Sequence, residues 1–116
     1  MAWGDGCLVH ANHHVLPGMA EHEAATPEEL HNSTRRQERI AALMEAARGR
    51  LDAAALKTIL CDHANRPHSI CAHPGERVSY SFASLIADLN AGHLEIAVGP
   101  PCEHEYAIYK IAEVGR

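Results

Sequence analysis

The last third of the chain contains three runs of strand-forming residues that are separated only by short turns. The runs are VSYSFASLIADL at 78–89, HLEIAVG at 93–99 and EYAIYKIAEV at 105–114. Short turns at 90–92 and 100–102 separate them, one containing Gly and the other two prolines. Turns of this kind join neighbouring antiparallel strands. The sequence therefore predicts a three-stranded antiparallel meander, which limits the possible folds more than any other feature.

Two helices are predicted upstream of the meander. Thr34 and Gln37 have the spacing of a capping box, which predicts that the first helix begins near Ser33. Apolar side chains then recur at helical intervals, at Ile40, Leu43, Met44 and Ala47. Asp52 is a favourable N-cap for a second helix, AAALKTILCDH at 53–63.

A further strand is predicted near the N-terminus, where CLVHANHHV at 7–15 has the composition of a strand and Pro17 and Gly18 follow it. Side-chain alternation would place four of its residues on one face, namely Leu8, His10, Asn12 and His14. The acidic, polar stretch 19–32 is predicted to be a loop or a short helical turn.

The order of strand, two helices and three strands predicts the α+β class, with one antiparallel sheet and two helices on one face. A length of 116 residues suits a single domain. The sequence has no internal repeat and no low-complexity tail, and residues 19–32 are its only linker-like stretch. Residues 1–116 are therefore expected to form one domain.

Composition and charge disfavour several classes of protein. The formal net charge is −5, with ten basic and fifteen acidic residues, whereas nucleic-acid binding needs clustered Lys and Arg. No apolar run approaches the length of a membrane span, and the first residues lack the pattern of a signal peptide. We therefore expect a cytoplasmic protein with four reduced cysteines and no nucleic-acid or membrane partner.

Ten histidines and four cysteines raise the question of a metal site. The candidate groups are Cys61 with His63, His68 with Cys71 and His73, and Cys102 with His104. Structural zinc sites usually present two knuckles of the Cys-x2-4-Cys or His-x3-5-His type, and no Cys-x2-Cys occurs here. The spacing therefore predicts no metal and no other cofactor. The sequence does not support a Cys/His nucleophilic pair either, because it singles out no third residue that would orient the histidine.

Asn12 is the candidate functional group in the crowded segment HANHH at 10–14. An asparagine on a sheet face can point its NH2 group at a developing oxyanion, and one such donor typically contributes about 3 kcal/mol of transition-state stabilisation. The alternative is that Asn12 only ties two strands together. Residue type alone favours that structural role.

Three stretches carry a resemblance to a known family. They are LVHANHHVLPG at 8–18, ILCDHANRPHSICAHP at 59–74 and SLIADLNAGHLEIAVGPPCEHEYAIYKI at 84–111, and the segment NSTRRQERIAAL at 32–43 lies between them. Together, in this order, they resemble the C-terminal portion of the acyl-coenzyme A:isopenicillin N acyltransferase family. Typical members carry a His-Thr-Asn-His segment, a Ser-x-Arg-x-x-Arg helix, a Leu-x-Asp-His…Ser-Ile-Cys-Arg-His-Pro stretch and a Gly-x-Pro-Cys turn. The resemblance covers nearly the whole chain.

The resemblance implies a four-layer αββα fold of the N-terminal-nucleophile (Ntn) hydrolase class, of which this chain would supply part. Such enzymes cleave themselves before a cysteine, whose free α-amine then serves as base for the thiol that attacks an amide or thioester. Asn12 matches the asparagine of the His-Thr-Asn-His segment and would be the oxyanion donor, with His10 and His14 supporting it. Ser69, Ile70 and Cys71 match the Ser-Ile-Cys stretch, which lies near the substrate pocket.

Two departures from the family pattern matter. Ala72 stands where relatives usually have an arginine, which could bind a carboxylate bidentately. The nucleophilic cysteine, upstream of the His-Thr-Asn-His segment in relatives, has no match here. Cys7 cannot replace it if 7–15 is a strand, because Cys7 and Asn12 would face opposite sides about 16 Å apart. We therefore expect a fragment or one part of a split enzyme, which is inactive unless an upstream polypeptide supplies the cysteine. The expected substrate is a small acyl donor.

Two other functions stay open. A small α+β domain could use an exposed sheet face to pair with another chain, because an uncovered apolar face drives association. A His/Cys metal-binding domain is the alternative that the spacing supports least.

Overall fold

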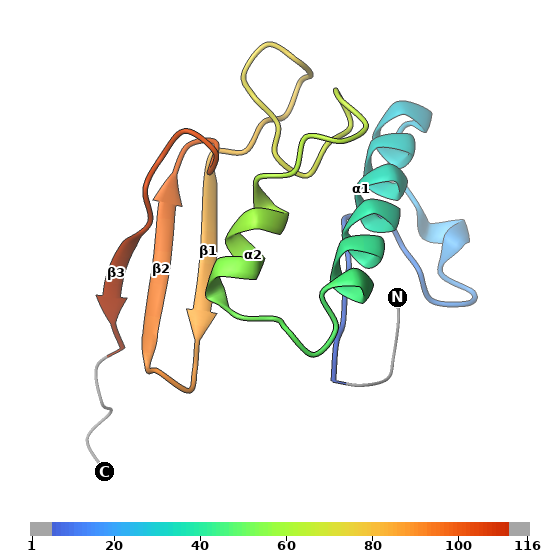
Figure 1. The fold of residues 1–116 in the computed structure, drawn as a ribbon. Helices are drawn as coiled ribbons and strands as arrows, with labels where there is room; N and C mark the ends of the chain where they lie inside the picture. The colour runs from blue at the N-terminus through green and yellow to red at the C-terminus, as the bar shows by residue number, and fades with distance from the viewer. Residues whose placement is uncertain (1–5, 112–116) are drawn as a thin grey trace.

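The computed structural model describes residues 6–111 and shows an α+β domain with two helices and an open three-stranded sheet (Figure 1). The elements in chain order are the 3-10 turn η1 (Ala20–His22), α1 (Pro27–Ala46), α2 (Ala53–Leu60), β1 (Ala83–Asp88), β2 (His93–Val98) and β3 (Ala107–Lys110). The strands pair antiparallel in the order β1-β2-β3, which confirms the predicted meander. The predicted third run extends to residue 114, and its last three residues lie outside the described residues.

Helix α1 begins earlier than the sequence predicted. The capping box is formed by Thr26 and Glu29, not by Thr34 and Gln37: the Thr26 hydroxyl accepts from the Glu29 N–H, and the Glu29 carboxylate accepts from the Thr26 N–H. Pro27 is the first helical residue, a position where proline loses no hydrogen bond because the N–H of that position has no partner within the helix. The stretch 19–32, predicted to be a loop or a short helical turn, therefore contains the 3-10 turn η1 and the first residues of α1.

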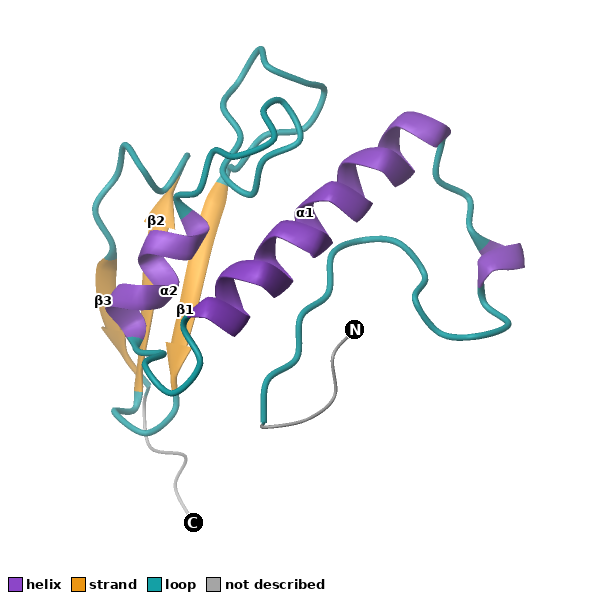
Figure 2. Ribbon diagram, turned by 45° about the vertical axis from the view of Figure 1, so that its right-hand side comes forward, coloured by secondary structure: helices purple, strands orange, loops and turns teal. Residues whose placement is uncertain are grey.

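The predicted strand at 7–15 is wrong, because the structure has no strand there. Side chains of α1 take the hydrogen bonds that a neighbouring strand would provide. Gln37 Oε1 accepts from the Ala11 N–H at 2.6 Å, and Ser33 Oγ accepts from the N–H groups of Asn12 and His13 at 2.8 and 3.0 Å. Ser33 and Gln37 are both buried, so this face of α1 is polar. The segment therefore runs as an extended loop along α1 (Figure 2).

The two helices do not share a face of the sheet, contrary to the prediction. Among the helices and strands of residues 6–111, α2 packs against β1, and α1 packs against α2 only (Figure 1). A bidentate ion pair connects α1 to the residue two positions after α2: Arg39 Nε and Nη2 donate to the two Asp62 oxygens at 2.8 and 2.7 Å. These hydrogen bonds from Arg39 are the main reason why the pKa of Asp62 is lowered.

Helix α2 covers one face of the sheet over β1 and β2, and no helix within residues 6–111 covers the other face. The buried residues of β1 and β2 are Ser84, Ile86, Glu95 and Ala97, which alternate along the strands. Within this face, the Glu95 carboxylate accepts from Lys57 Nζ of α2 at 2.6 Å. The Lys57 ammonium also lies 4.9 Å from the centre of the Tyr106 ring.

The uncovered face is entirely apolar. By strand register it consists of Ala83, Leu85, Ala87, Leu94, Ile96, Val98, Ala107 and Tyr109. Val98 is 74% exposed, and Leu85 and Tyr109 are each 56% exposed. We call these eight residues the apolar sheet face. A sheet with solvent on one side normally has polar residues on the solvent side. Here the exposed face carries the apolar residues instead.

Neither helix within residues 6–111 combines the length and the apolar composition that crossing a membrane requires.

Candidate functional site

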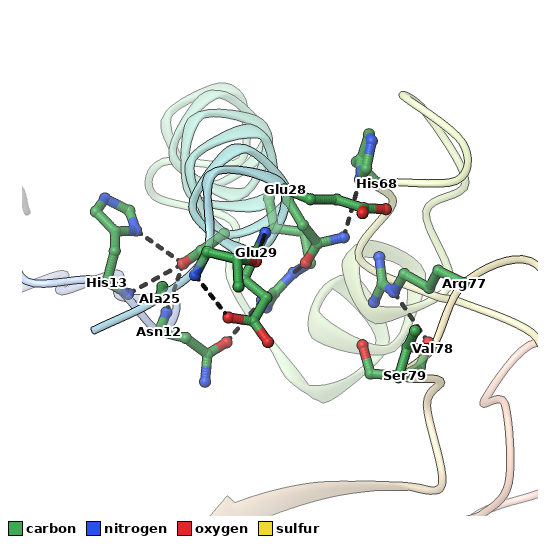
Figure 3. Close-up of a pocket in the computed structure, with 13 residues that line it drawn as sticks. Asn12, His13, Ala25, Glu28, Glu29, His68, Arg77, Val78 and Ser79 are labelled. Carbon is green, nitrogen blue, oxygen red and sulfur yellow. Dashed lines mark hydrogen bonds between the residues drawn. The ribbon is translucent and has the colours of Figure 1, made fainter. Parts of the chain in front are cut away.

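A cavity of about 500 Å³ opens between the first turns of α1, the N-terminal loop and the long connection that follows α2. The described residues that line it are Asn12, His13, Ala25, Thr26, Glu28, Glu29, Asn32, Ser33, Arg36, His68, Arg77, Val78 and Ser79 (Figure 3). Polar side chains predominate in this lining, and they come from three separate parts of the chain. The cavity therefore depends on the tertiary fold and not on any one segment.

Asn12 lines this cavity, and its carboxamide has a defined orientation. Arg36 Nη2 donates to Asn12 Oδ1 at 2.6 Å. Because a guanidinium can only donate, it fixes which end of the amide is the oxygen. The Asn12 NH2 group makes no hydrogen bond to any residue within 6–111, so it is available as a donor.

The predicted support of Asn12 by His10 and His14 is wrong in its geometry. His10 Nε2 lies 2.8 Å from the carbonyl oxygen of His13, and the backbone N–H of His14 donates to Glu23. Both histidines are exposed. The prediction relied on a strand that would have put these side chains on one face, and Arg36 performs the orienting role instead.

Two half-buried guanidinium groups give one part of the cavity a positive charge. Arg36 Nε donates to Asn32 Oδ1 at 2.8 Å. Arg77 donates to the backbone carbonyls of Pro67, Ser69 and Ser79 at 2.9, 3.2 and 3.0 Å. Burial, and secondarily the charge of Arg77, lower the pKa of Arg36. These groups can bind an anionic substituent such as a carboxylate.

A second group of side chains meets where the connection after α2 approaches the turn between β2 and β3. His63, Cys71, His73 and Cys102 each offer one ligand atom, and these four atoms lie within 4.8 Å of one another. Cys102 Sγ is 3.2 Å from His73 Nε2, and His73 Nδ1 is 3.1 Å from a Glu103 oxygen. Residues of this type could hold a metal ion.

No protein-family model matches the chain, and no curated protein matches it.

The predicted substrate residues Ser69, Ile70 and Cys71 are not among the described residues that line the cavity. Ser69 is fully buried, and its hydroxyl donates to the Cys71 carbonyl at 2.5 Å. Cys71 points its sulfur toward Cys102, 3.7 Å away. Ser69 is connected to the cavity through Arg77, because its carbonyl oxygen accepts a hydrogen bond from the Arg77 side chain. Direct contact of these three residues with a substrate stays a prediction.

Ala72 is fully buried, and its N–H donates to Ser81 Oγ at 3.0 Å. An arginine is much larger than alanine and would not fit at this position without displacing neighbours. The guanidinium groups of the cavity come from Arg36 and Arg77, which no sequence motif marked as site residues. The charged lining of the cavity therefore does not depend on position 72.

Cys7 is half-buried and is not one of the described lining residues. Its exclusion as a nucleophile assumed that residues 7–15 form a strand, and that premise is wrong. The exclusion now rests on the position of Cys7 outside the cavity that Asn12 lines.

Proposed function

We propose that this chain supplies one sheet layer and a substrate cavity to an Ntn-type acyltransferase or amidohydrolase whose nucleophilic cysteine lies on additional polypeptide. The apolar sheet face is the observation that carries the proposal. In an αββα sandwich each sheet has helices on one face and a second sheet on the other. Here α2 covers the face that contains Glu95, and the opposite, exposed face is wholly apolar. A second sheet is the natural occupant of that face.

The proposed chemistry is acyl transfer through a covalent intermediate. The cysteine thiolate attacks the carbonyl carbon of an amide or thioester, and the carbonyl oxygen becomes an oxyanion. The Asn12 NH2 group donates to this oxygen. Collapse of the tetrahedral intermediate expels the amine or thiol, which takes up the proton that the free α-amine removed from the nucleophile. An amine or a water molecule then accepts the acyl group.

The cavity also suggests a class of substrate. Arg36 and Arg77 can bind a negatively charged group of the acyl donor, whereas Glu28 and Glu29 of the same lining repel one, so such a group must contact the arginines directly. A cytoplasmic location is part of this proposal, since four reduced cysteines would suit a reducing compartment.

Leu85→Lys combined with Val98→Lys is expected to weaken binding of the polypeptide encoded in frame upstream by at least about 100-fold. Full burial of an aliphatic side chain contributes about 1.5–3 kcal/mol, and a lysine at the same place adds a desolvation cost. Both residues are exposed in this chain, so its own stability should change little. Co-purification and titration calorimetry measure the binding.

Ile108→Lys is the matched control. Ile108 is 65% exposed and pairs with Glu95, so it lies on the opposite face of the sheet. Equal losses from both sets of substitutions would remove the support for a second sheet on the apolar sheet face. Specific binding of a polypeptide that has no cysteine at its mature N-terminus would favour the non-catalytic interaction module.

A further inference from the structure

The four side chains of the second cluster have the spacing of a tetrahedral metal site. Zinc binds Cys sulfur at about 2.3 Å and His nitrogen at about 2.0–2.1 Å, so neighbouring ligand atoms of a tetrahedron lie about 3.3–3.8 Å apart. The two sulfurs of Cys71 and Cys102 are 3.7 Å apart. The nitrogens of His63 and His73 are 3.1 Å apart, and His73 Nε2 is 3.2 Å from Cys102 Sγ. These three pairs are close to the tetrahedral separations and all four atoms lie within 4.8 Å of one another, so small side-chain rotations would bring all four around one small ion.

Neither a disulfide nor a catalytic thiol gives a role to all four side chains of the cluster. The Sγ–Sγ distance of 3.7 Å is far longer than the bond of about 2.05 Å in a disulfide. A Cys102–His73–Glu103 nucleophile would use the exposed thiol, but it gives no role to His63 or to the fully buried Cys71. A metal ion uses all four side chains at once.

The surroundings of the cluster resemble those of known metal sites. Glu103 contacts His73 through Nδ1, which leaves Nε2 directed at the cluster; metal-binding histidines usually have such a carboxylate partner. The Cys71 N–H donates to the Asp62 carbonyl at 3.0 Å, which fixes the backbone at this ligand. Gly99, with φ of +94°, donates its N–H to the Phe82 carbonyl and begins the turn that carries Cys102.

We propose that His63, Cys71, His73 and Cys102 bind one zinc ion in a structural, four-coordinate site. Two thiolates and two imidazoles suit zinc, and four protein ligands leave no open position for catalysis. Binding releases the two thiol protons to solvent. The ion would join the connection 61–82, which has no helix or strand, to the turn after β2. His68 and Arg77 lie on that connection, so the ion would also hold one wall of the cavity. This inference does not depend on the proposed acyl transfer.

The test is a cobalt titration of the whole chain after removal of metal by a chelator. Wild-type protein is expected to bind one Co²⁺ per chain, with the intense visible bands of a tetrahedral ion and a thiolate-to-cobalt charge-transfer band, and one Zn²⁺ should abolish both. Cys102→Ser should lose stoichiometric binding and weaken the charge-transfer band. Cys7→Ser is the matched control, because Cys7 lies outside the cluster, and it should bind like the wild type.

A second measurement applies even if the ligand variants do not fold. Cys102 is exposed, so iodoacetamide should modify it readily in metal-free wild-type protein and slowly after one equivalent of Zn²⁺ is added. The melting temperature should rise with the same stoichiometry. Rapid modification of Cys102 at saturating Zn²⁺, or octahedral weak-band cobalt spectra, would overturn the proposal. Fast alkylation of Cys102 in protein that binds neither Zn²⁺ nor Co²⁺ when either ion is added would instead point to the Cys102–His73–Glu103 nucleophile.

Discussion

Lys57→Met is expected to lower the free energy of unfolding by about 2–3 kcal/mol. Removing one partner of a fully buried ion pair costs about 3–5 kcal/mol, because the remaining charge has no compensation. The Glu95 side chain is only 6% exposed, whereas that of Lys57 is 34% exposed, and His93 Nε2 lies 3.8 Å from the second Glu95 oxygen, so water and His93 offset part of the loss here. The substitution also removes the cation above the Tyr106 ring. Urea unfolding followed by circular dichroism measures the change.

Two further variants show whether the buried charge is the cause. Lys57→Met combined with Glu95→Leu should recover most of the lost stability, since an apolar pair of similar volume replaces the ion pair. Lys110→Met removes an exposed lysine from the same sheet and should change stability by less than about 0.5 kcal/mol. A double variant no more stable than Lys57→Met alone would show that the methionine, and not the uncompensated Glu95, causes the loss.

In the proposed acyltransferase or amidohydrolase, Asn12→Ala is expected to lower kcat by about 10²–10³-fold, the effect of removing one oxyanion donor. KM should change much less, because the hydrogen bond strengthens as negative charge develops on the carbonyl oxygen. Steady-state kinetics on the chain joined to its upstream polypeptide, with an amide or thioester substrate, measures both constants. Asn12 is exposed in this chain, so the variant should fold.

Asn12→Asp separates the two possible roles of this side chain. Aspartate keeps an oxygen acceptor for Arg36 and loses the NH2 donor. If Asn12 stabilises an oxyanion, this variant should lose as much activity as Asn12→Ala. Wild-type activity in Asn12→Asp would mean that Asn12 only positions Arg36.

The meander was predictable because the residues that determine its strands and turns are close together in the sequence. Each strand has a continuous run of strand-forming residues, and Gly92 or the two prolines mark its turns. The start of α2 was predictable for the same reason: the Asp52 side chain accepts from the Ala55 N–H as an N-cap should. Both features depend on neighbours in the sequence.

The N-terminal segment was not predictable from local pattern. Its backbone is extended, and its composition suits a strand, but its hydrogen-bond partners are the side chains of Ser33 and Gln37. Nothing near residues 9–13 in the sequence indicates that a polar helix face will replace a strand. The contact between Arg36 and Asn12, which are 24 residues apart, could not be predicted for the same reason.

All four ligands of the proposed zinc site were among the candidate groups, but the spacing rules did not support them because they do not form the usual knuckles in sequence. Cys61, His68 and His104 also belonged to the candidate groups, and the fold uses none of these three in the cluster. His63 follows the end of one helix, Cys71 and His73 lie further along the connection, and Cys102 lies in a turn between strands. Spacing rules describe compact knuckles, so a site assembled from distant segments falls outside them. The three short Cys/His groups were the signal in the sequence, and they did not show which of their members would meet in the fold.

The most direct test of the proposed function is the rate of acyl release from a chromogenic amide or thioester, measured with this chain co-produced with the polypeptide encoded in frame upstream. We predict turnover by the complex, none by this chain alone, and none when the N-terminal cysteine of the upstream polypeptide is replaced by alanine. A complex that forms and shows no turnover on any acyl donor tested, or turnover by this chain alone, would contradict the proposal.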